Sequence, residues 1–325
     1  MKSLNYLNKF FYKYRFRILI GILITIIARI FALVAPNLIG ESITIIDNYL
    51  SNGNDPTNVK KSLISNILLI IGASITAGFF TFIMRQTLIN VSRFIEFDLK
   101  NEIFQKYQEL NISFYKKNRI GDLMNRISED VSKVRMYVGP ALMYSINTIT
   151  LFIIIITYML SIDVKLTLYT IIPLPLLSLI IYKLSKRINI KSMKVQKSLS
   201  KLTTITQESF SGISIIKSYA IEEELNKHIE DVSMETRNRH IDLAKFQSWF
   251  LPMMVLLIGM SNILVIYVGG NQFINGKIEL GILAEFIIYV NMLTWPVATV
   301  GWVTSIVQQA EASQSRINQF LNEKI

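Results

Sequence analysis

The segment SFYKKNRIGDLMNRISED, residues 113–130, is a charged and polar stretch around one glycine in a chain that is otherwise strongly apolar. It lies inside a long connection, residues 85–138, that separates two apolar blocks, contains no proline and has Gly121 as its only glycine. Connections of this length rarely lack structure of their own. Because helix breakers are absent except at one interior point, the pattern predicts a helix, a turn at Gly121 and a second helix.

Apolar residues at helical spacing support this hairpin on both sides of Gly121. They form one face before the glycine and another after it: Ile95, Leu99, Ile103, Tyr107 and Leu110, then Leu123, Ile127, Val131, Val134 and Val138. A second long connection, residues 183–248, also contains no proline and has Gly212 as its only glycine. We therefore expect two long helical hairpins that project beyond the apolar blocks.

The apolar blocks indicate a polytopic membrane protein. Of the 325 residues 51% are hydrophobic, and the mean hydropathy of +0.40 is too high for an ordinary soluble domain. Six blocks have about the 20 apolar residues that a membrane-spanning helix needs: residues 18–39, 63–84, 140–161, 164–184, 250–268 and 280–303. Only Ile162 and Asp163 separate the third block from the fourth, which predicts a tight reversal. Prolines 173, 175 and 296 predict kinks in the fourth and sixth spans.

The distribution of Lys and Arg predicts the orientation in the membrane, because positive flanking segments stay in the cytoplasm. These residues concentrate in residues 1–17, 85–138 and 183–248, whereas the other three connections hold only Lys60, Lys61, Lys165 and Lys277. Both termini and both hairpins are therefore expected to be cytoplasmic. The asymmetry accounts for most of the net charge of +11 without a nucleic acid partner, and it favours contact with anionic lipid headgroups. The chain has no cysteine, which excludes disulfides and thiolate sites, and we expect no metal site.

Three segments together resemble the transmembrane domain of ABC exporters: FYKKNRIGDLMNRISEDV (114–131), DVKLTL (163–168) and ITQESFSGISIIKSYAIEEE (205–224). The resemblance is to half-transporters of the multidrug and lipid-flippase type. It implies an all-α membrane protein with six transmembrane helices, two long cytoplasmic helical hairpins and a domain-swapped dimer, a homodimer by this resemblance, in a bacterial plasma membrane. Its implied parts are an amino-terminal elbow helix (1–17), the transmembrane domain (18–305) and a linker (306–325).

The resemblance also implies that the hairpin tips carry short coupling helices that press on nucleotide-binding domains. Carried over by motif, these tips are Lys116, Lys117, Asn118, Arg119, Ile120, Gly121 and Asp122, and then Ser209, Phe210, Ser211, Gly212, Ile213 and Ser214. ATP-driven closure of those domains would draw the tips together and switch the cavity between inward-facing and outward-facing states. The implied activity is export or flipping of a lipid-like or amphipathic substrate by alternating access.

The nucleotide-binding domain itself is not expected in this chain. The phosphate-binding pattern GxxxxGK[ST] is absent, since GNQFINGKI from Gly270 is one residue too long and lacks the hydroxyl residue, and no LSGGQ-like signature occurs. We therefore expect the chain to be cut or encoded separately at the domain boundary and to have no ATPase activity of its own. ATP and Mg²⁺ would bind the partner domain. A non-transporting assembly or regulatory subunit, or a membrane sensor with helical signalling hairpins, remains an alternative.

Polar and aromatic residues within the blocks are candidates for the substrate cavity: Arg29, Phe79, Phe82, Asn147, Asn291 and Trp295. A charged group in a spanning helix is a functional candidate because burying its charge is costly. For Arg29, an internal pair or a snorkelling side chain is the alternative, and for the asparagines it is hydrogen bonding between helices. The aromatic residues could equally serve packing or anchor the helices at the membrane interface. Glu285 lies near the outer end of the sixth block and is expected to be solvated.

Overall fold

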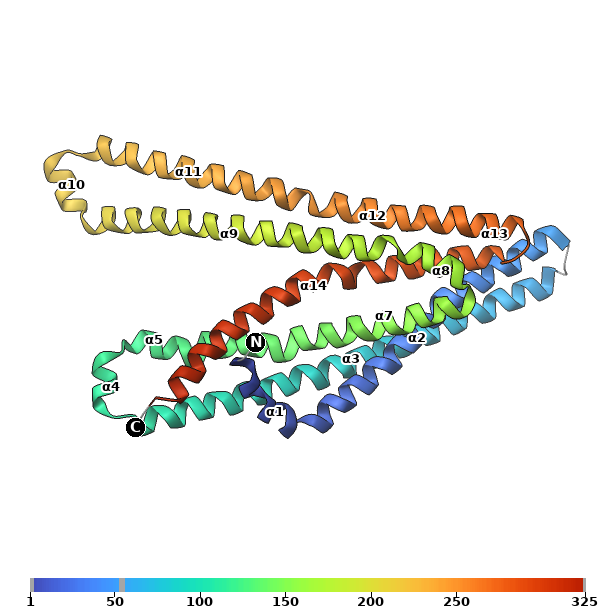
Figure 1. The fold of residues 1–325 in the computed structure, drawn as a ribbon, viewed down its shortest axis with the longest axis horizontal. Coiled ribbons are helices and arrows are strands. Elements are labelled where there is room, and N and C mark those ends of the chain that lie inside the picture. Colours follow the sequence, from blue (N-terminus) through green and yellow to red (C-terminus); the bar gives the residue numbers. More distant parts are fainter. Residues whose placement is uncertain (1–2, 53–55, 324–325) are drawn as a thin grey trace. The chain divides into compact units, whose positions relative to one another are not determined.

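The computed structural model describes residues 3–52 and 56–323, and within them it contains helices and no strand (Figure 1). The first half of the chain forms η1 (Ser3–Leu7), α1 (Asn8–Lys13), α2 (Arg15–Asn52), α3 (Pro56–Glu109), α4 (Ile112–Lys117), α5 (Ile120–Asn125), η2 (Arg126–Asp130), α6 (Val131–Met136), η3 (Tyr137–Ala141) and α7 (Leu142–Ile162). The second half forms α8 (Val164–Ile171), α9 (Pro173–Ser211), α10 (Ile213–Tyr219), α11 (Glu222–Ser248), α12 (Phe250–Leu264), η4 (Val265–Gly269), α13 (Gly270–Ile274) and α14 (Leu280–Leu321). The expected all-α class is confirmed.

Within the described residues, six helical runs are long and apolar enough to cross a membrane, as the sequence predicted. They are Arg15–Ser51, Pro56–Glu109, Ile120–Ile162, Val164–Ser211, Glu222–Ile274 and Leu280–Leu321. Each run is longer than its apolar block because the helices continue past the apolar segment. The 54 residues of α3 span about 80 Å at 1.5 Å per residue, against about 30 Å of hydrocarbon. A helix of this length would extend well beyond a bilayer that it crosses.

The prolines act in two different ways. In the fourth run the helix is interrupted at Ile172, and α9 starts at Pro173, where the missing N–H costs nothing because the first turn leaves its N–H groups unpaired. Pro296 instead lies inside α14 without ending it. In the fourth span, where a kink was predicted, one helix ends and another begins, while the sixth span remains one helix.

The chain forms two compact units, residues 1–171 with 261–325, and residues 172–260. In the first unit α2 and α3 lie side by side, and α14 packs on α2, α6 and α7 (Figure 1). The backbones of α2 and α14 approach closely at Gly40 and Gly281. A Cβ atom added to Gly281 would lie 1.9 Å from the carbonyl oxygen of Gly40. Only glycine fits there, because the two backbones themselves are in contact.

The reversal between α7 and α8 lies at Asp163, as the spacing predicted. Asp163 Oδ1 accepts a hydrogen bond from the Leu166 N–H at 2.5 Å, so its side chain caps the start of α8. Its other carboxylate oxygen accepts a hydrogen bond from Gln272 Nε2 at 3.1 Å. One acidic side chain therefore closes the turn and also ties it to α13.

One hydrophobic cluster of the first unit lies away from the apolar blocks, where α3, η2, α6 and the end of α14 meet. The apolar faces predicted for the first hairpin are buried there, including Ile95, Leu99, Val131 and Val134. From α14 this cluster contains Ala310, Ile317 and Phe320. Leu4, Leu7 and Phe10 from the amino-terminal helices belong to the same cluster, so the amino-terminal segment is part of the core of the first hairpin.

The second unit is a long helical hairpin in which α9 and α11 lie side by side and α10 closes the tip (Figure 1). Val195 and Val232 are buried between the helices, and the hydroxyl groups of Ser198 and Thr236 are 2.9 Å apart in a buried contact. An ion pair of 3.0 Å joins Lys191 Nζ to Asp242. Most residues of α9, α10 and α11 are nevertheless exposed.

Candidate functional site

The first tip, residues 110–125, consists of two short helices and the links around them. Asn111 precedes α4, and its side-chain oxygen accepts a hydrogen bond from the Phe114 N–H at 3.1 Å. The chain then turns at Asn118 and Arg119, where the backbone is extended. Gly121 is the second residue of α5 and has no positive φ. The predicted position of the turn is wrong: Asn111 and Asn118 bond the ends of α4, so no glycine is required.

Aromatic side chains connect the first tip to α3 and to the end of α14. Tyr115 Oη donates a hydrogen bond to the Tyr107 carbonyl, and Tyr107 Oη donates one to the Leu123 carbonyl. The rings of Tyr107 and Phe320 have centroids 4.7 Å apart, and the Arg126 guanidinium lies 5.4 Å from the Phe320 ring. Phe320 belongs to the last turn of α14, and its ring centroid also lies 6.0 Å from that of Phe114 in α4, so the tip contacts the end of that helix.

A second link between this hairpin and α14 is an ion pair of Asp130 with Arg316. Arg316 Nε donates to Asp130 Oδ2 at 3.0 Å, and the guanidinium makes a second bond to Oδ1, so the pair is bidentate. Asp130 is buried, whereas half of the Arg316 side chain is exposed. Asp130 lies in the segment quoted at the outset, but its partner is 186 residues away and no local pattern indicates it.

We expect Arg316→Met to destabilise the first unit by about 2 kcal/mol, because it leaves the buried Asp130 carboxylate without its cation. Chemical denaturation of the purified chain in detergent micelles measures this change. The double variant Asp130→Asn with Arg316→Met should recover a large part of the loss, since the remaining amide carries no charge. Equal destabilisation in the single and double variants would contradict a charge-specific role for the pair.

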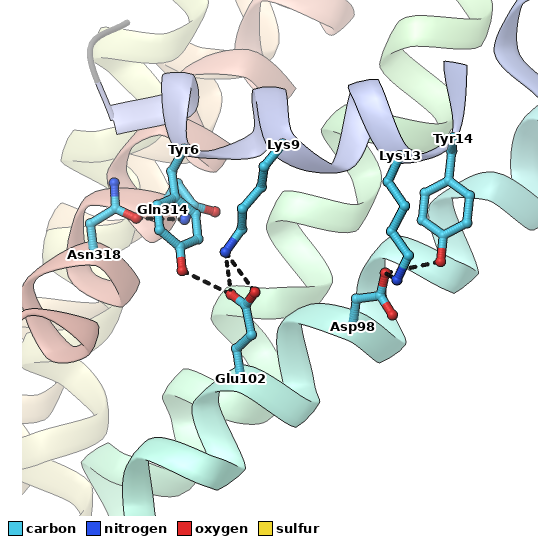
Figure 2. Close-up of polar contacts among 8 residues, drawn as sticks. All are labelled: Tyr6, Lys9, Lys13, Tyr14, Asp98, Glu102, Gln314 and Asn318. Atoms are coloured by element: carbon cyan, nitrogen blue, oxygen red, sulfur yellow. Dashed lines mark hydrogen bonds and ion pairs between the residues drawn. The ribbon is translucent and has the colours of Figure 1, made fainter. Parts of the chain in front are cut away.

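The amino-terminal segment is bound to α3 by charged and aromatic side chains (Figure 2). The Glu102 carboxylate accepts hydrogen bonds from Tyr6 Oη at 2.8 Å and from Lys9 Nζ at 2.6 Å. One turn earlier on α3, Asp98 accepts a hydrogen bond from Lys13 Nζ at 2.7 Å, which raises the pKa of Lys13 above its ordinary value. These exposed pairs each contribute little free energy, so they serve chiefly to fix where the segment lies.

The same segment is also bound to the end of α14. The Ser3 N–H donates to Glu311 Oε1 at 3.1 Å, and Asn318 Nδ2 donates to the Ser3 carbonyl at 3.0 Å. Gln314 Nε2 in turn donates to Asn318 Oδ1 at 2.7 Å and holds that amide in place (Figure 2). The segment from Ser3, helix α3 and the end of α14 thus form one assembly next to the first tip.

The outer surface of the first tip is exposed. Of the residues predicted to couple, Asn118 is half-buried and the others are exposed: Lys116, Lys117, Arg119, Ile120, Gly121 and Asp122. Ile120 is 73% exposed, and Met124 and Ile112 are exposed as well. A Cβ atom on Gly121 would meet nothing within 4 Å. The first tip therefore exposes apolar side chains among charged and polar residues.

The second tip, residues 209–221, has a similar surface and belongs to the second unit. Gly212 separates α9 from α10, as predicted, but Ala220 with φ of 52° completes the reversal. Phe210 is 73% exposed beside a groove of about 630 Å³. Ser209 is half-buried with its hydroxyl bonded to the Ile205 carbonyl. Of the other residues predicted to couple at this tip, Gly212 is half-buried, and Ser211, Ile213 and Ser214 are exposed.

The predicted cavity residues lie on four helices of the first unit. Arg29 on α2 and Asn147 on α7 are half-buried, and Arg29 Nε and Asn147 Oδ1 find no hydrogen-bond partner among the described residues. The other four are exposed, on α3 and α14: Phe79, Phe82, Asn291 and Trp295. The assignment of these six residues to a substrate cavity stays a prediction.

Glu285 on α14 is not solvated, contrary to the expectation from its place near the end of the block. Only 5% of it is exposed. Its Oε1 accepts hydrogen bonds from Tyr289 Oη at 2.6 Å and from Asn37 Nδ2 at 3.2 Å, and Asn37 also donates to Tyr158 Oη at 2.6 Å. These partners come from α2, α7 and α14, so the acid is part of a polar junction between three helices.

Comparisons with known proteins agree on one family. Residues 18–297 match the family model described as ABC transporter transmembrane region. The chain is 27% identical over 326 residues to the multidrug resistance-like ATP-binding protein MdlA of Buchnera aphidicola subsp. Schizaphis graminum, covering 100% of this chain and 55% of that protein. It is 25% identical to the probable multidrug resistance ABC transporter ATP-binding/permease protein YheI of Bacillus subtilis, covering 97% of this chain and 53% of that protein.

A further relative is the ATP-dependent lipid A-core flippase of Syntrophus aciditrophicus, which is 27% identical over 223 residues, or 68% of this chain and 37% of that protein. The chain thus spans about half, or less, of the length of the curated relatives it matches. The match to the family model covers all six apolar blocks except the end of the last one.

Proposed function

Because this chain belongs to the family of ABC transporter transmembrane regions, we propose that it acts as the membrane part of an ATP-driven exporter. Two such chains would enclose the translocation path, and nucleotide-binding domains would dock on the two tips. ATP and Mg²⁺ would bind those domains. Their closure would move the tips, and the long helices would transmit that movement to the membrane.

The observation that carries this proposal is the apolar surface of the two tips. Ile120 and Phe210 are each 73% exposed, and Tyr219 is 76% exposed, at the ends of the two hairpins. Exposed aromatic and aliphatic side chains of this kind are typical of binding hot spots. The assembly of Phe320 and Tyr107 under the first tip supports the same reading, because it would pass a push on the tip directly to α14.

The names of the relatives support an amphipathic or lipid-like substrate, since they include multidrug transporters and a lipid flippase. Exposed aromatic side chains in the spanning helices, such as Phe79 and Trp295, suit such a substrate. Alternating access would expose one central site to each side of the membrane in turn.

The proposal is tested by ATPase and transport measurements on the chain assembled with its nucleotide-binding domains in liposomes. Stimulation of ATPase activity by lipids or amphipathic drugs, together with ATP-dependent movement of the same compounds, is the expected result. An assembly that hydrolyses ATP but is neither stimulated by nor moves any such compound would contradict the exporter function. It would favour an assembly or regulatory subunit instead.

At the first tip we expect Gly121→Trp to lower the coupling of ATP hydrolysis to transport at least about tenfold, by blocking the docking surface. Membrane insertion and thermal stability should not change, because a side chain at this position would meet nothing within 4 Å. Gly121→Ala is the matched control and should keep coupling, since alanine is small and suits the helix better. Loss of insertion in Gly121→Trp would show instead that the glycine serves folding.

A further inference from the structure

A groove in the second unit combines basic and aromatic side chains where two helices leave the apolar blocks. It has a volume of about 600 Å³ and lies between α9 and the junction of α11 with α12. Lys183, Lys186 and Arg187 line it from α9, Phe246 lines it from α11, and Trp249 lines it from the junction of α11 with α12. None of the residues that line it is acidic among those the structure describes.

The position of the groove along the chain places it at a membrane surface. The fourth apolar block ends at residue 184 and the fifth begins at residue 250, so the three cations and Trp249 lie at this boundary. Trp at such a boundary is typical of the headgroup region. Immediately on the apolar side of the groove, exposed residues such as Leu179 and Leu251 offer a surface for acyl chains.

The three cations have no counter-charge in the described parts of this unit. The ion pairs found there join other residues: Lys191 with Asp242, Lys217 with Glu222, and Arg239 with Glu235. The Asp242 carboxylate is the acidic group nearest along α11, and Lys191 already neutralises it at 3.0 Å. Positive charge therefore accumulates at the groove without an internal partner.

We propose that this groove binds the headgroup of an anionic phospholipid. Lys183, Lys186 and Arg187 would hold the phosphate, with the acyl chains lying along the apolar side of α9 and α12. A lipid phosphate is favoured over a soluble anion because the groove opens onto the apolar surface of the same helices. The proposal rests on the proposed function only for the side of the membrane, which would be cytoplasmic.

Quenching of tryptophan fluorescence by brominated lipids tests this site in the full chain. The variant Trp295→Phe with Trp302→Phe leaves Trp249 as the only tryptophan, because the chain has three. It is reconstituted in nanodiscs that contain brominated phosphatidylglycerol or brominated phosphatidylcholine at matched mole fractions. We expect half-maximal quenching of Trp249 at a mole fraction of phosphatidylglycerol at least about fivefold lower, as each surface cation contributes about that factor.

The triple variant Lys183→Gln, Lys186→Gln, Arg187→Gln should abolish this preference. Its matched control removes three cations from the same helix two to four turns farther from the membrane: Lys194→Gln, Lys197→Gln and Lys201→Gln. The control should keep the preference. If the triple variant is not monodisperse, the single variant Arg187→Gln replaces it. It should raise the mole fraction of phosphatidylglycerol at half-maximal quenching about fivefold.

Three outcomes would overturn the proposal. Equal quenching by both lipids would show that the groove does not select charge. Equal loss in the control variant would show a diffuse basic collar and no defined site. Protection of Trp249 from both lipids in the assembled dimer would show that a second copy of the chain covers the groove. None of these results depends on ATP hydrolysis, so the exporter function could fail or hold independently.

Discussion

Gly281→Leu should destabilise the folded chain by about 3 kcal/mol, because it forces apart two helices whose backbones touch. A Cβ atom at this position would lie 1.9 Å from the Gly40 carbonyl oxygen and 2.5 Å from the Thr44 hydroxyl. The backbone carbonyl cannot rotate away as a side chain could. The helices α2 and α14 must therefore separate, and the nearby hydrogen bond from Asn37 to Glu285 would be lost with them.

Because the chain has no cysteine, one introduced cysteine can report its thermal unfolding directly. A single cysteine introduced as Ala28→Cys, at a position on α2 that is 1% exposed, reports unfolding through its reaction with a thiol-specific fluorophore during heating. Gly72→Leu and Gly78→Leu are matched controls on α3, where an added side chain meets nothing within 4 Å, and they should leave the midpoint unchanged or slightly raised. If Gly281→Leu has the same midpoint temperature of unfolding as the controls, this result would contradict the close crossing of α2 and α14.

Periodicity predicted the parts of this fold that depend on local spacing. The apolar faces around residues 95–110 and 123–138 are buried because a helix brings every third or fourth residue to one side. The reversal at Asp163 was predictable for the same local reason, since two residues between apolar blocks allow only a tight turn. Local pattern also identified the two hairpins, although it placed the first turn at Gly121 rather than at Asn118 and Arg119.

The features that sequence reasoning missed depend on contacts between distant segments. Glu285 is buried because Asn37 and Tyr158, from two other helices, build a polar junction around it. Ala220 adopts a left-handed conformation that propensity assigns to glycine, so the geometry of the second tip overrides the residue's own preference. A contact between the tip residues and a partner depends on the partner's surface as well, so neither local pattern nor the packing within this chain determines it.

Phe210→Asp should abolish productive docking on the second tip. The ring is 73% exposed at the end of α9, and a charged group in its place would have to be desolvated against the partner's surface. A loss of about 2 kcal/mol or more in docking corresponds to an affinity at least about thirtyfold lower for the nucleotide-binding domain. In the assembled transporter, ATP-dependent transport should therefore fall to background while the chain itself stays folded.

Met193→Asp is the matched control for this experiment. Met193 is also 73% exposed and also lies on α9, but it is 17 residues, or about 25 Å, from Phe210 along the helix. Both substitutions place the same charge on an exposed apolar position, so any general effect on solubility or helix stability appears in both. Loss of transport in Phe210→Asp alone would locate the contact at the second tip. Equal loss in both variants, or full transport in Phe210→Asp, would refute a docking role for this residue, because the tip would then differ in no functional respect from the leg that supports it.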